Sequence, residues 1–294
     1  MTTLRVTHNT SYTYDRPVTF GPHRLMLRPR DGHDLRILES ALLIFPTARV
    51  RWEFDTFGNS VALASFGQPA DRLTIESALT LRRYGYDGQV DHLASQATPY
   101  PFRYSDDELI DLAPLMQLHS PAERPATLAW LDAVLASAPG GSMEVLELLN
   151  RTIHRGFRYR RREEPGVQTP AETIGLGEGS CRDFALLFIE AARLLGFAAR
   201  FVTGYLYDPA RDASRQGGEA LTGSGSTHAW ADVFVPGVGW LEFDPTNQIV
   251  GGNSLIRVAT TRAPSQAVPV QGTYQHDGAE LTGMEVRVTL TEAE

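Results

Sequence analysis

One stretch restricts the fold of this chain more than any other: residues 177–196, with the sequence GEGSCRDFALLFIEAARLLG. Between its flanking glycines the stretch is apolar on nearly every side, which predicts a helix that runs through a core rather than along a surface. Ser180 followed by Asp183 has the form of a capping box, so Ser180 is the expected N-cap and Cys181 the first helical residue. Gly196 is the expected stop. The helix therefore presents the one cysteine of the chain at its N-terminal end.

A thiol in that position has an electrostatic reason to ionise. The positive end of the helix dipole and the unpaired amides of the first turn both favour the thiolate, which is the nucleophilic form. The alternative is that Cys181 only packs in the core, because cysteine is often simply a small buried hydrophobic residue. The position of Cys181 on the helix does not decide between the two.

The composition narrows the classes of function. A length of 294 residues favours two domains. The net charge of −8 makes nucleic acid and anionic membranes unlikely partners, and a single cysteine excludes an internal disulfide and a cysteine-cluster metal site. No cofactor is expected. Residues 1–8 lack the apolar core of a secretory signal and no run approaches 18 apolar residues, so we predict a cytoplasmic protein. The oligomeric state stays open.

The first hundred residues indicate β-structure without a catalytic grouping. Residues 49–55, RVRWEFD, alternate charged and apolar side chains, as a half-buried strand would. Further strands are expected at residues 7–14, 61–66 and 73–84, with a turn at 55–59, which favours a sandwich or a strongly bent sheet. The histidines here, His8 among them, are scattered and expected in surface or packing roles. Prolines in residues 97–104 mark a linker, which gives predicted domains 1–98 and 99–294.

Helices and then strands are expected in the second domain. A helix should run from Pro121 to Ala138, and a second should begin at a Ser142 cap. The apolar face of the second helix consists of Val145, Leu146, Leu149 and Ile153. A strand at 198–207, a Gly- and Ser-rich loop at 208–226 and a late strand at 284–291 follow, and the late strand could rejoin a sheet.

The pairing of two strands, 227–235 and 240–245, decides whether Cys181 has a base. If the loop between them is the four residues 236–239, paired residue numbers sum to 475, and Asp244 points to the face opposite His228. If the loop has three or five residues, or a strand bulges, the sum is 474; Asp244 then pairs with Trp230, on the face of His228 and within reach of it. Asp232, on the same strand and face as His228, is the alternative partner. The sequence leaves these registers open.

Four segments together resemble the bacterial transglutaminase-like superfamily: GSCRDFA, ARFVTGY, THAWADV and GWLEFDPTN. The resemblance covers residues 157–247, and LRPR at 27–30 with DTFGN at 55–59 resembles the β-rich domain that precedes such cores. It implies an α+β protein with an N-terminal β-sandwich-like domain followed by a papain-like core, in which the cysteine helix packs on an antiparallel sheet.

The resemblance also implies roles for individual residues. Cys181 would be the nucleophile, His228 the general base and acid, and Asp244 the carboxylate that orients the histidine. The backbone N–H of Cys181 is expected in the oxyanion hole. The remaining cleft residues are expectations of a weaker kind: Tyr159 or Gln168 as the second oxyanion donor, and Trp230 and Trp240 as walls.

The chemistry expected of such a site is acyl transfer from a peptide or protein amide through a thioester. Hydrolysis is favoured, because water is always present and no acidic pocket for an amine is evident. An amine acceptor is the other outcome, and the absence of lysine among the 27 basic residues is the one hint toward it. No calcium site like those of animal transglutaminases is recognisable, so no metal is expected. Outside this class, a non-catalytic scaffold on the same fold or a redox-sensing thiol are the alternatives.

Overall fold

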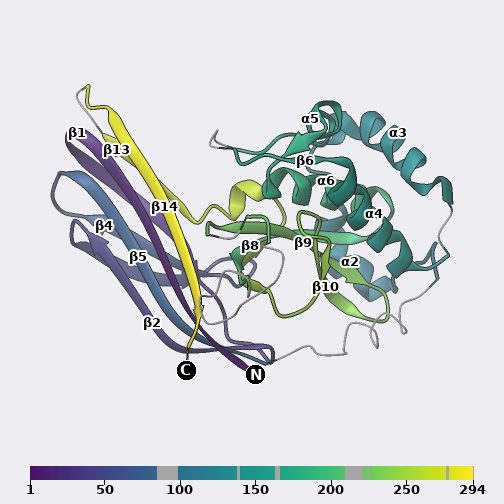
Figure 1. Ribbon diagram of the computed structural model, residues 1–294, viewed down its shortest axis with the longest axis horizontal. Coiled ribbons are helices and arrows are strands. Elements are labelled where there is room, and N and C mark those ends of the chain that lie inside the picture. Colours follow the sequence, from purple (N-terminus) through teal and green to yellow (C-terminus); the bar gives the residue numbers. More distant parts are fainter. Residues whose placement is uncertain are drawn as a thin grey trace.

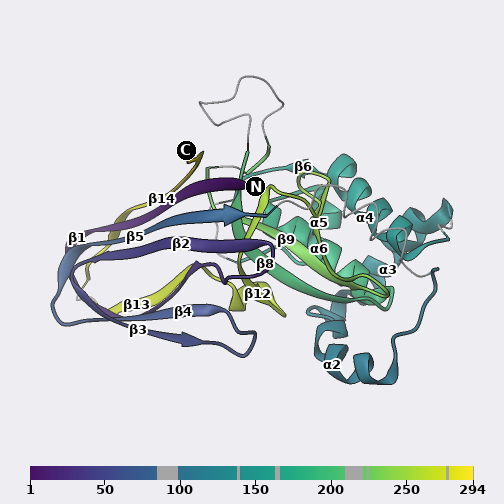
Figure 2. The same ribbon diagram turned by 90° about the horizontal axis from the view of Figure 1, so that it is seen from below.

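The computed structural model describes residues 1–84, 99–137, 140–162, 166–208, 221–223, 225–275 and 278–293. A curled antiparallel sheet of long strands lies beside a core of helices and a second sheet (Figures 1 and 2). The predicted α+β class is therefore confirmed. Of the two forms expected for the N-terminal region, the strongly bent sheet is the one that forms.

The curled sheet is organised around one long strand, β1. The first half of β1 pairs with β5 and β14 and its second half with β4 and β13, with shifts of register between the halves. The strands of this sheet are β1 (Thr2–Arg28), β2 (Leu35–Phe45), β3 (Ala48–Phe54), β4 (Ser60–Phe66), β5 (Ala70–Arg83), β13 (Val270–Gln275) and β14 (Leu281–Glu292).

Two C-terminal strands, β13 and β14, belong to the sheet of the N-terminal region. The late strand expected at 284–291 is present within β14 and rejoins a sheet, as predicted. Because β13 and β14 both pair with β1, residues 99–294 contribute two strands to the sheet of the N-terminal region. The boundary at residue 98 adjoins residues outside the described part of the chain and stays a prediction.

The burial expected for β3 was wrong. Its side chains alternate as predicted, but Val50, Trp52 and Phe54 are 37%, 47% and 71% exposed. The reason is the place of the strand: β3 is last in the order β2-β5-β1-β4-β3 and pairs with β4 alone. Alternating side chains predict a strand with one apolar and one polar face. They do not predict whether another element packs on the apolar face.

The core is built on a five-stranded antiparallel sheet with the order β11-β10-β9-β8-β12. The helix α6 (Cys181–Leu194) packs on it, mainly against β9 and β8, and the face of β9 turned toward the helix carries Ala229, Ala231, Val233 and Val235. The strands of this sheet are β8 (Ala198–Leu206), β9 (His228–Val235), β10 (Gly239–Asp244), β11 (Ile249–Val250) and β12 (Leu255–Thr261).

The helix α6 is the predicted buried helix. Its N-cap is Ser180, and Gly196 follows its end with a positive φ of 91°, both as expected. Three of its charged residues are also buried and make polar contacts: Asp183, described below with the site, and Glu190 and Arg193. Glu190 accepts hydrogen bonds from the backbone N–H groups of His119 and Ser120. Arg193 donates to three carbonyl oxygens, those of Leu115, Ala199 and Arg262. These bonds hold the helix in place from several sides.

The other helices partly match expectation. The helix α2 (Asp106–Met116) was not predicted, although Ser105 and Glu108 form the capping box that signals it. The helix expected from Pro121 begins as a 3-10 turn and continues as α3 (Arg124–Val134) and a second 3-10 turn to Ser137; its predicted end at Ala138 lies outside the described residues. In α4 (Ser142–Gly156) the N-cap is Gly141 rather than Ser142, because Ser142 is already helical; its predicted apolar face is buried. Among the described helices, none has the length and hydropathy needed to cross a bilayer.

Candidate active site

The N-terminal end of α6 is fixed by the buried carboxylate of Asp183. Its Oδ2 accepts hydrogen bonds from the backbone N–H and the hydroxyl of Ser180, each at 2.7 Å. Its Oδ1 accepts from the backbone N–H of Gln168 at 2.7 Å and from Nη1 of Arg162 at 2.9 Å. These four bonds join the turn before the helix to the segment that follows β6 (Arg158–Tyr159). Cys181 therefore projects from a rigidly held position, with 7% of its surface exposed.

The register left open by the sequence is the one that brings the histidine and the aspartate together. Val235 pairs with Gly239 and Phe243 with Ala231, so the loop has three residues, 236–238, and paired numbers sum to 474. Continued to Asp244, this register places the carboxylate on the face of His228. Nε2 of His228 donates to Oδ2 of Asp244 at 2.8 Å.

Both members of this pair are buried, and each changes the acidity of the other. Burial by itself lowers the pKa of His228, but the charges of Asp244 and Cys181 outweigh burial and raise the pKa to about 10. Burial raises the pKa of Asp244, but His228 and the hydrogen bonds from Asn247 and Thr246 outweigh it, so that pKa is lowered. The pair therefore favours an imidazolium beside a carboxylate.

The second ring nitrogen of His228, Nδ1, does not contact Asp244. Nδ1 is buried and forms no hydrogen bond with another residue in the described part of the chain. The charge of Cys181 is one of the causes of the raised pKa of this ring, so the thiol lies within electrostatic range of the histidine. A hydrogen bond thus joins His228 to Asp244, and an electrostatic interaction links the same ring to Cys181.

Asp232, the alternative partner of His228, is engaged elsewhere. Its Oδ2 accepts two hydrogen bonds from Arg200, from Nε at 3.0 Å and from Nη2 at 2.8 Å. The same guanidinium lies over the ring of Trp240, with 3.8 Å between its carbon and the ring centroid. Arg200 thus links Asp232 and Trp240 in a second polar cluster.

Two of the expected cleft residues lie at the site. The buried ring of Trp230 stacks on His228, with centroids 6.1 Å apart and an interplanar angle of 28°. Tyr159 lies close by: a Cβ placed on Gly223 would be 2.9 Å from Nδ1 of His228 and 3.7 Å from the hydroxyl of Tyr159. Burial, followed by the charge of Cys181, raises the pKa of Tyr159 to about 12.

Trp240 lies away from the site, whereas Gln168 lies beside the turn before α6: a Cβ placed on Gly179 would be 3.1 Å from its Oε1. Trp240 pairs with Phe234, six positions along β9 from His228, which corresponds to about 20 Å of strand. Gln168 lies at the start of α5 (Pro170–Leu176), where its Oε1 accepts from the hydroxyl of Thr173 at 3.2 Å. Among the described residues, no hydrogen bond joins the side chain of Gln168 to the three residues of the candidate site.

Sequence reasoning did not single out Asn247 and Gly223, which also border the site. Asn247 donates to Oδ2 of Asp244 at 2.8 Å, and Gly223 lies against His228 with a positive φ of 89°. A signal for Asn247 was available, because it stands three residues after Asp244 in the segment DPTN. Nothing in the sequence indicated that Gly223 would contact the ring.

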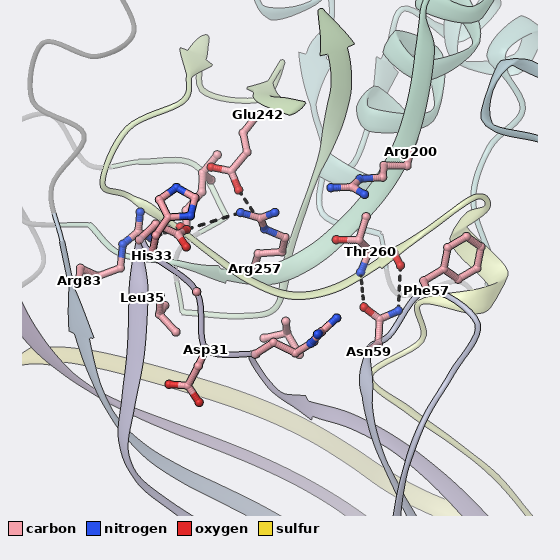
Figure 3. A pocket seen from close by; sticks show the side chains of 15 residues that line it. Asp31, His33, Leu35, Phe57, Asn59, Arg83, Arg200, Glu242, Arg257 and Thr260 are labelled. Atoms are coloured by element: carbon pink, nitrogen blue, oxygen red, sulfur yellow. Dashed lines mark hydrogen bonds and ion pairs between the residues drawn. The ribbon is translucent and has the colours of Figure 1, made fainter. Parts of the chain in front are cut away.

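A separate polar cavity of about 300 Å³ lies where the curled sheet meets the far side of the core sheet (Figure 3). Arg257 forms ion pairs there with Asp34 at 3.5 Å and with Glu242 at 3.6 Å. Burial is the main cause that raises the pKa of Glu242, to about 7. The residues that line this cavity do not include Cys181, His228 or Asp244, so it is distinct from the candidate active site.

Two family models match this chain. The model of the bacterial transglutaminase-like N-terminal region matches residues 4–82, and that of the transglutaminase-like superfamily matches residues 133–245. The "Uncharacterized protein Rv2569c" of Mycobacterium tuberculosis is 30% identical over 291 residues, which cover 91% of this chain and 86% of the relative. The "Uncharacterized protein ML0607" of Mycobacterium leprae is 26% identical, with 98% of each chain covered.

A solved structure shares the whole architecture. The crystal structure of "a Putative Cysteine Protease from Cytophaga hutchinsonii" superposes with a TM-score of 0.70 and covers 98% of this chain and 90% of that one. At 15% identity this similarity establishes the fold. The two matching family models and the full-length relatives together establish the family: this chain belongs to the transglutaminase-like superfamily and carries the bacterial transglutaminase-like N-terminal region.

Proposed function

We propose that this protein catalyses thiol-dependent acyl transfer on amide bonds of a peptide or protein, with hydrolysis as the main outcome. One observation carries the proposal: His228 is hydrogen-bonded through Nε2 to the buried Asp244, while its Nδ1 is left for Cys181. A nucleophile, a base and a group that orients the base are the minimum that this chemistry requires.

The reaction would begin from the thiolate of Cys181 and the imidazolium of His228. The sulfur attacks the carbonyl carbon of the amide, and a C–S bond forms. The C–N bond then breaks, and the amine leaves with the proton from Nδ1 of His228, which gives a thioester and a neutral ring. Water next gives a proton to Nδ1 as its oxygen attacks the thioester. The C–S bond breaks, the acid leaves, and the thiolate and imidazolium are restored.

Two donors would stabilise the negative oxygen of each tetrahedral intermediate. The backbone N–H of Cys181 is at the start of α6, where the helix offers unpaired amides. For the second we propose the hydroxyl of Tyr159, because it is near His228 and because a pKa of about 12 keeps it protonated over the working pH range. Gln168 is the weaker candidate, since its side chain contacts Thr173.

Transamidation would use the same three residues, with an amine in place of water as the acceptor. The lysine-free composition favours that outcome only weakly, and we retain hydrolysis as the proposal. A non-catalytic scaffold would have no need of a buried histidine placed between a carboxylate and a thiol. The cytoplasmic location stays a prediction.

The test is alkylation of Cys181 by iodoacetamide, followed by intact mass from pH 5 to pH 9, in the wild type and in His228→Ala. We expect the wild type to react fast at pH 6, well below the range near pH 8.5 where a free thiol ionises, and the variant to lose this reactivity. Cys181→Ala is the control that should gain no mass, because the chain has no other cysteine. Equal pH dependence in wild type and His228→Ala, or no reaction of the folded protein, would contradict the proposal.

A screen of peptide and glutamine amides, with and without an added primary amine, then separates the two outcomes. Hydrolysis gives a carboxylic acid and releases the amine or ammonia, whereas transamidation gives a product that carries the mass of the added amine; a glutamine amide releases ammonia in both reactions. Cys181→Ala provides the background rate.

A further inference from the structure

Asn247 makes three hydrogen bonds that join the candidate site to a distant segment. Its Nδ2 donates to Oδ2 of Asp244 at 2.8 Å, the same oxygen that accepts from His228. The same nitrogen donates to the carbonyl oxygen of Thr222 at 3.1 Å, and Oδ1 of Asn247 accepts from the backbone N–H of Thr222 at 2.8 Å. The side-chain amide thus pairs with both backbone groups of one residue, Thr222, as a neighbouring β-strand would, and its remaining proton reaches the carboxylate.

The segment held in this way, residues 221–223, lies against His228. Its first residue is fixed independently, because the backbone N–H of Leu221 donates to Oδ2 of Asp208 at 2.9 Å. At its other end, a Cβ placed on Gly223 would lie 2.9 Å from Nδ1 and 3.3 Å from Cε1 of the histidine. The segment therefore borders the edge of the ring that faces the thiol.

We propose that Asn247 is a positioning residue of the active site, which holds the carboxylate of Asp244 and the segment 221–223 in register on either side of His228. The inference rests on the proposed function, since it assigns a role within the same site. Asp244 has its Oδ1 occupied by the backbone N–H of Thr246, so the second donor on Oδ2 leaves the carboxylate no freedom to rotate away from the ring. At the same time the two bonds to the backbone of Thr222 keep Gly223 against Nδ1.

The chain supplies a matched control, because it builds the same arrangement a second time far from the site. Asn59 donates to Oδ2 of Asp55 at 3.0 Å and to the carbonyl oxygen of Thr260 at 2.8 Å, and its Oδ1 accepts from the backbone N–H of Thr260 at 2.9 Å. Figure 3 shows this second asparagine joining the curled sheet to the core at the polar cavity. The two asparagines make the same three bonds, but their aspartates differ in partner: Asp244 contacts His228, whereas Asp55 forms an ion pair with Arg24 at 3.2 Å.

The experiment compares Asn247→Asp with Asn59→Asp in the full chain. The new carboxyl at position 247 can donate to Asp244 only while it is protonated, and once ionised it repels that carboxylate. Relative to the wild type at each pH, we expect the rate of Cys181 alkylation to fall about 10-fold or more at pH 6.5, where the fast reaction depends on the ion pair, and about 4-fold or less at pH 8, where a free thiol is already partly ionised. Asn59→Asp should melt at a lower temperature and keep the alkylation profile of the wild type.

The outcomes separate this inference from the proposed function. If His228→Ala leaves alkylation unchanged, the proposed function fails. If His228→Ala abolishes the fast reaction while Asn247→Asp and Asn59→Asp share one pH profile, only the positioning role is overturned. Asn247→Ala, at a part-buried position, is the second variant and should slow alkylation about 10-fold at pH 6. Loss of folding in both Asn247 variants would make the residue a structural one and would also overturn the proposal.

Discussion

Two buried histidines in this molecule have opposite acid–base character. His8 lies where β1 packs on the core sheet; Tyr205 Oη is 3.2 Å from its Nδ1 and Thr10 Oγ1 is 3.1 Å from its Nε2. Burial lowers the pKa of His8 to about 4. His228 is equally buried, but the charges of Asp244 and Cys181 raise its pKa to about 10.

The comparison teaches that burial alone says little about the role of a histidine. Burial opposes the charged ring in both places, and the charge of the neighbour decides the outcome. The two rings also differ in what they leave open: both nitrogens of His8 contact hydroxyl groups, whereas Nδ1 of His228 has no hydrogen-bond partner among the described residues. The neutral ring serves packing, and the charged ring with a free edge can move a proton.

The largest effect should follow from making the neighbour of His228 neutral. Asp244→Asn keeps the shape of the side chain and removes the charge, so burial should bring the pKa of His228 far below 10. We expect a loss of about 10⁴-fold in turnover of an amide substrate. The pKa would be measured from the ring protons of His228 by NMR. A pKa that stays near 10 would show that Asp244 is not the cause of the shift.

An intermediate effect on stability should follow from replacing His8. Because the folded pKa of about 4 is below the ordinary value of 6.5, the unfolded chain binds more protons between these values. The stability due to neutral His8 is therefore complete above pH 6.5 and is lost as pH falls toward 4, by about 2 to 3 kcal/mol at pH 4.5. His8→Gln should remove this dependence. The measurement is the urea unfolding free energy of both proteins at pH 7 and 4.5, and identical slopes with pH would contradict the expectation.

The smallest effect should follow from giving His8 an acidic neighbour. Thr10→Asp places a carboxylate where the hydroxyl now contacts Nε2 of His8. The pKa of His8 should rise above 6.5, so its contribution should reverse sign: present below pH 6.5 and lost as pH rises through the new pKa. The change should amount to about 1 kcal/mol, because burying the pair carries its own cost. Thr10→Asn is the uncharged control, and the prediction fails if both variants show the same pH dependence of unfolding.

What the sequence predicted well depends on short-range patterns. The start of α6 at Cys181 rests on a cap and a carboxylate three residues apart, and both signals lie within one turn. The burial of the helix follows from its apolar composition. Such features need no knowledge of the rest of the chain, and they were predicted correctly.

The partnership of His228 and Asp244 could be stated only as one of two registers. The four residues PGVG allow a loop of three or four, and the choice moves Asp244 from one face of the sheet to the other. The structure uses Gly239 as the first residue of β10, with a positive φ of 95°. Tertiary packing selects this register, and the sequence of the loop alone does not.

Features that join distant segments were beyond sequence reasoning. Asn247 is recognisable in its motif, but its partner Thr222 comes from a segment whose path the sequence did not fix. Trp240 was expected at the cleft because it resembles a motif residue, although it lies at the far end of β10 from Asp244. The exposed face of β3 depends on the order of strands, which the pattern of a single strand does not contain.

The pairing of β1 with β14 delays completion of the curled sheet during synthesis. Leu4 pairs with Glu292, so the first strand to be synthesised waits for the last. At the usual rate of about 5 to 20 residues per second, the ribosome leaves this edge of β1 without its partner for roughly 15 to 60 s. During that interval the N–H and C=O groups along β1 are open to any other extended chain. Until β14 is made, this edge of β1 is therefore a site of aggregation, and a chaperone that covers it would protect the nascent chain.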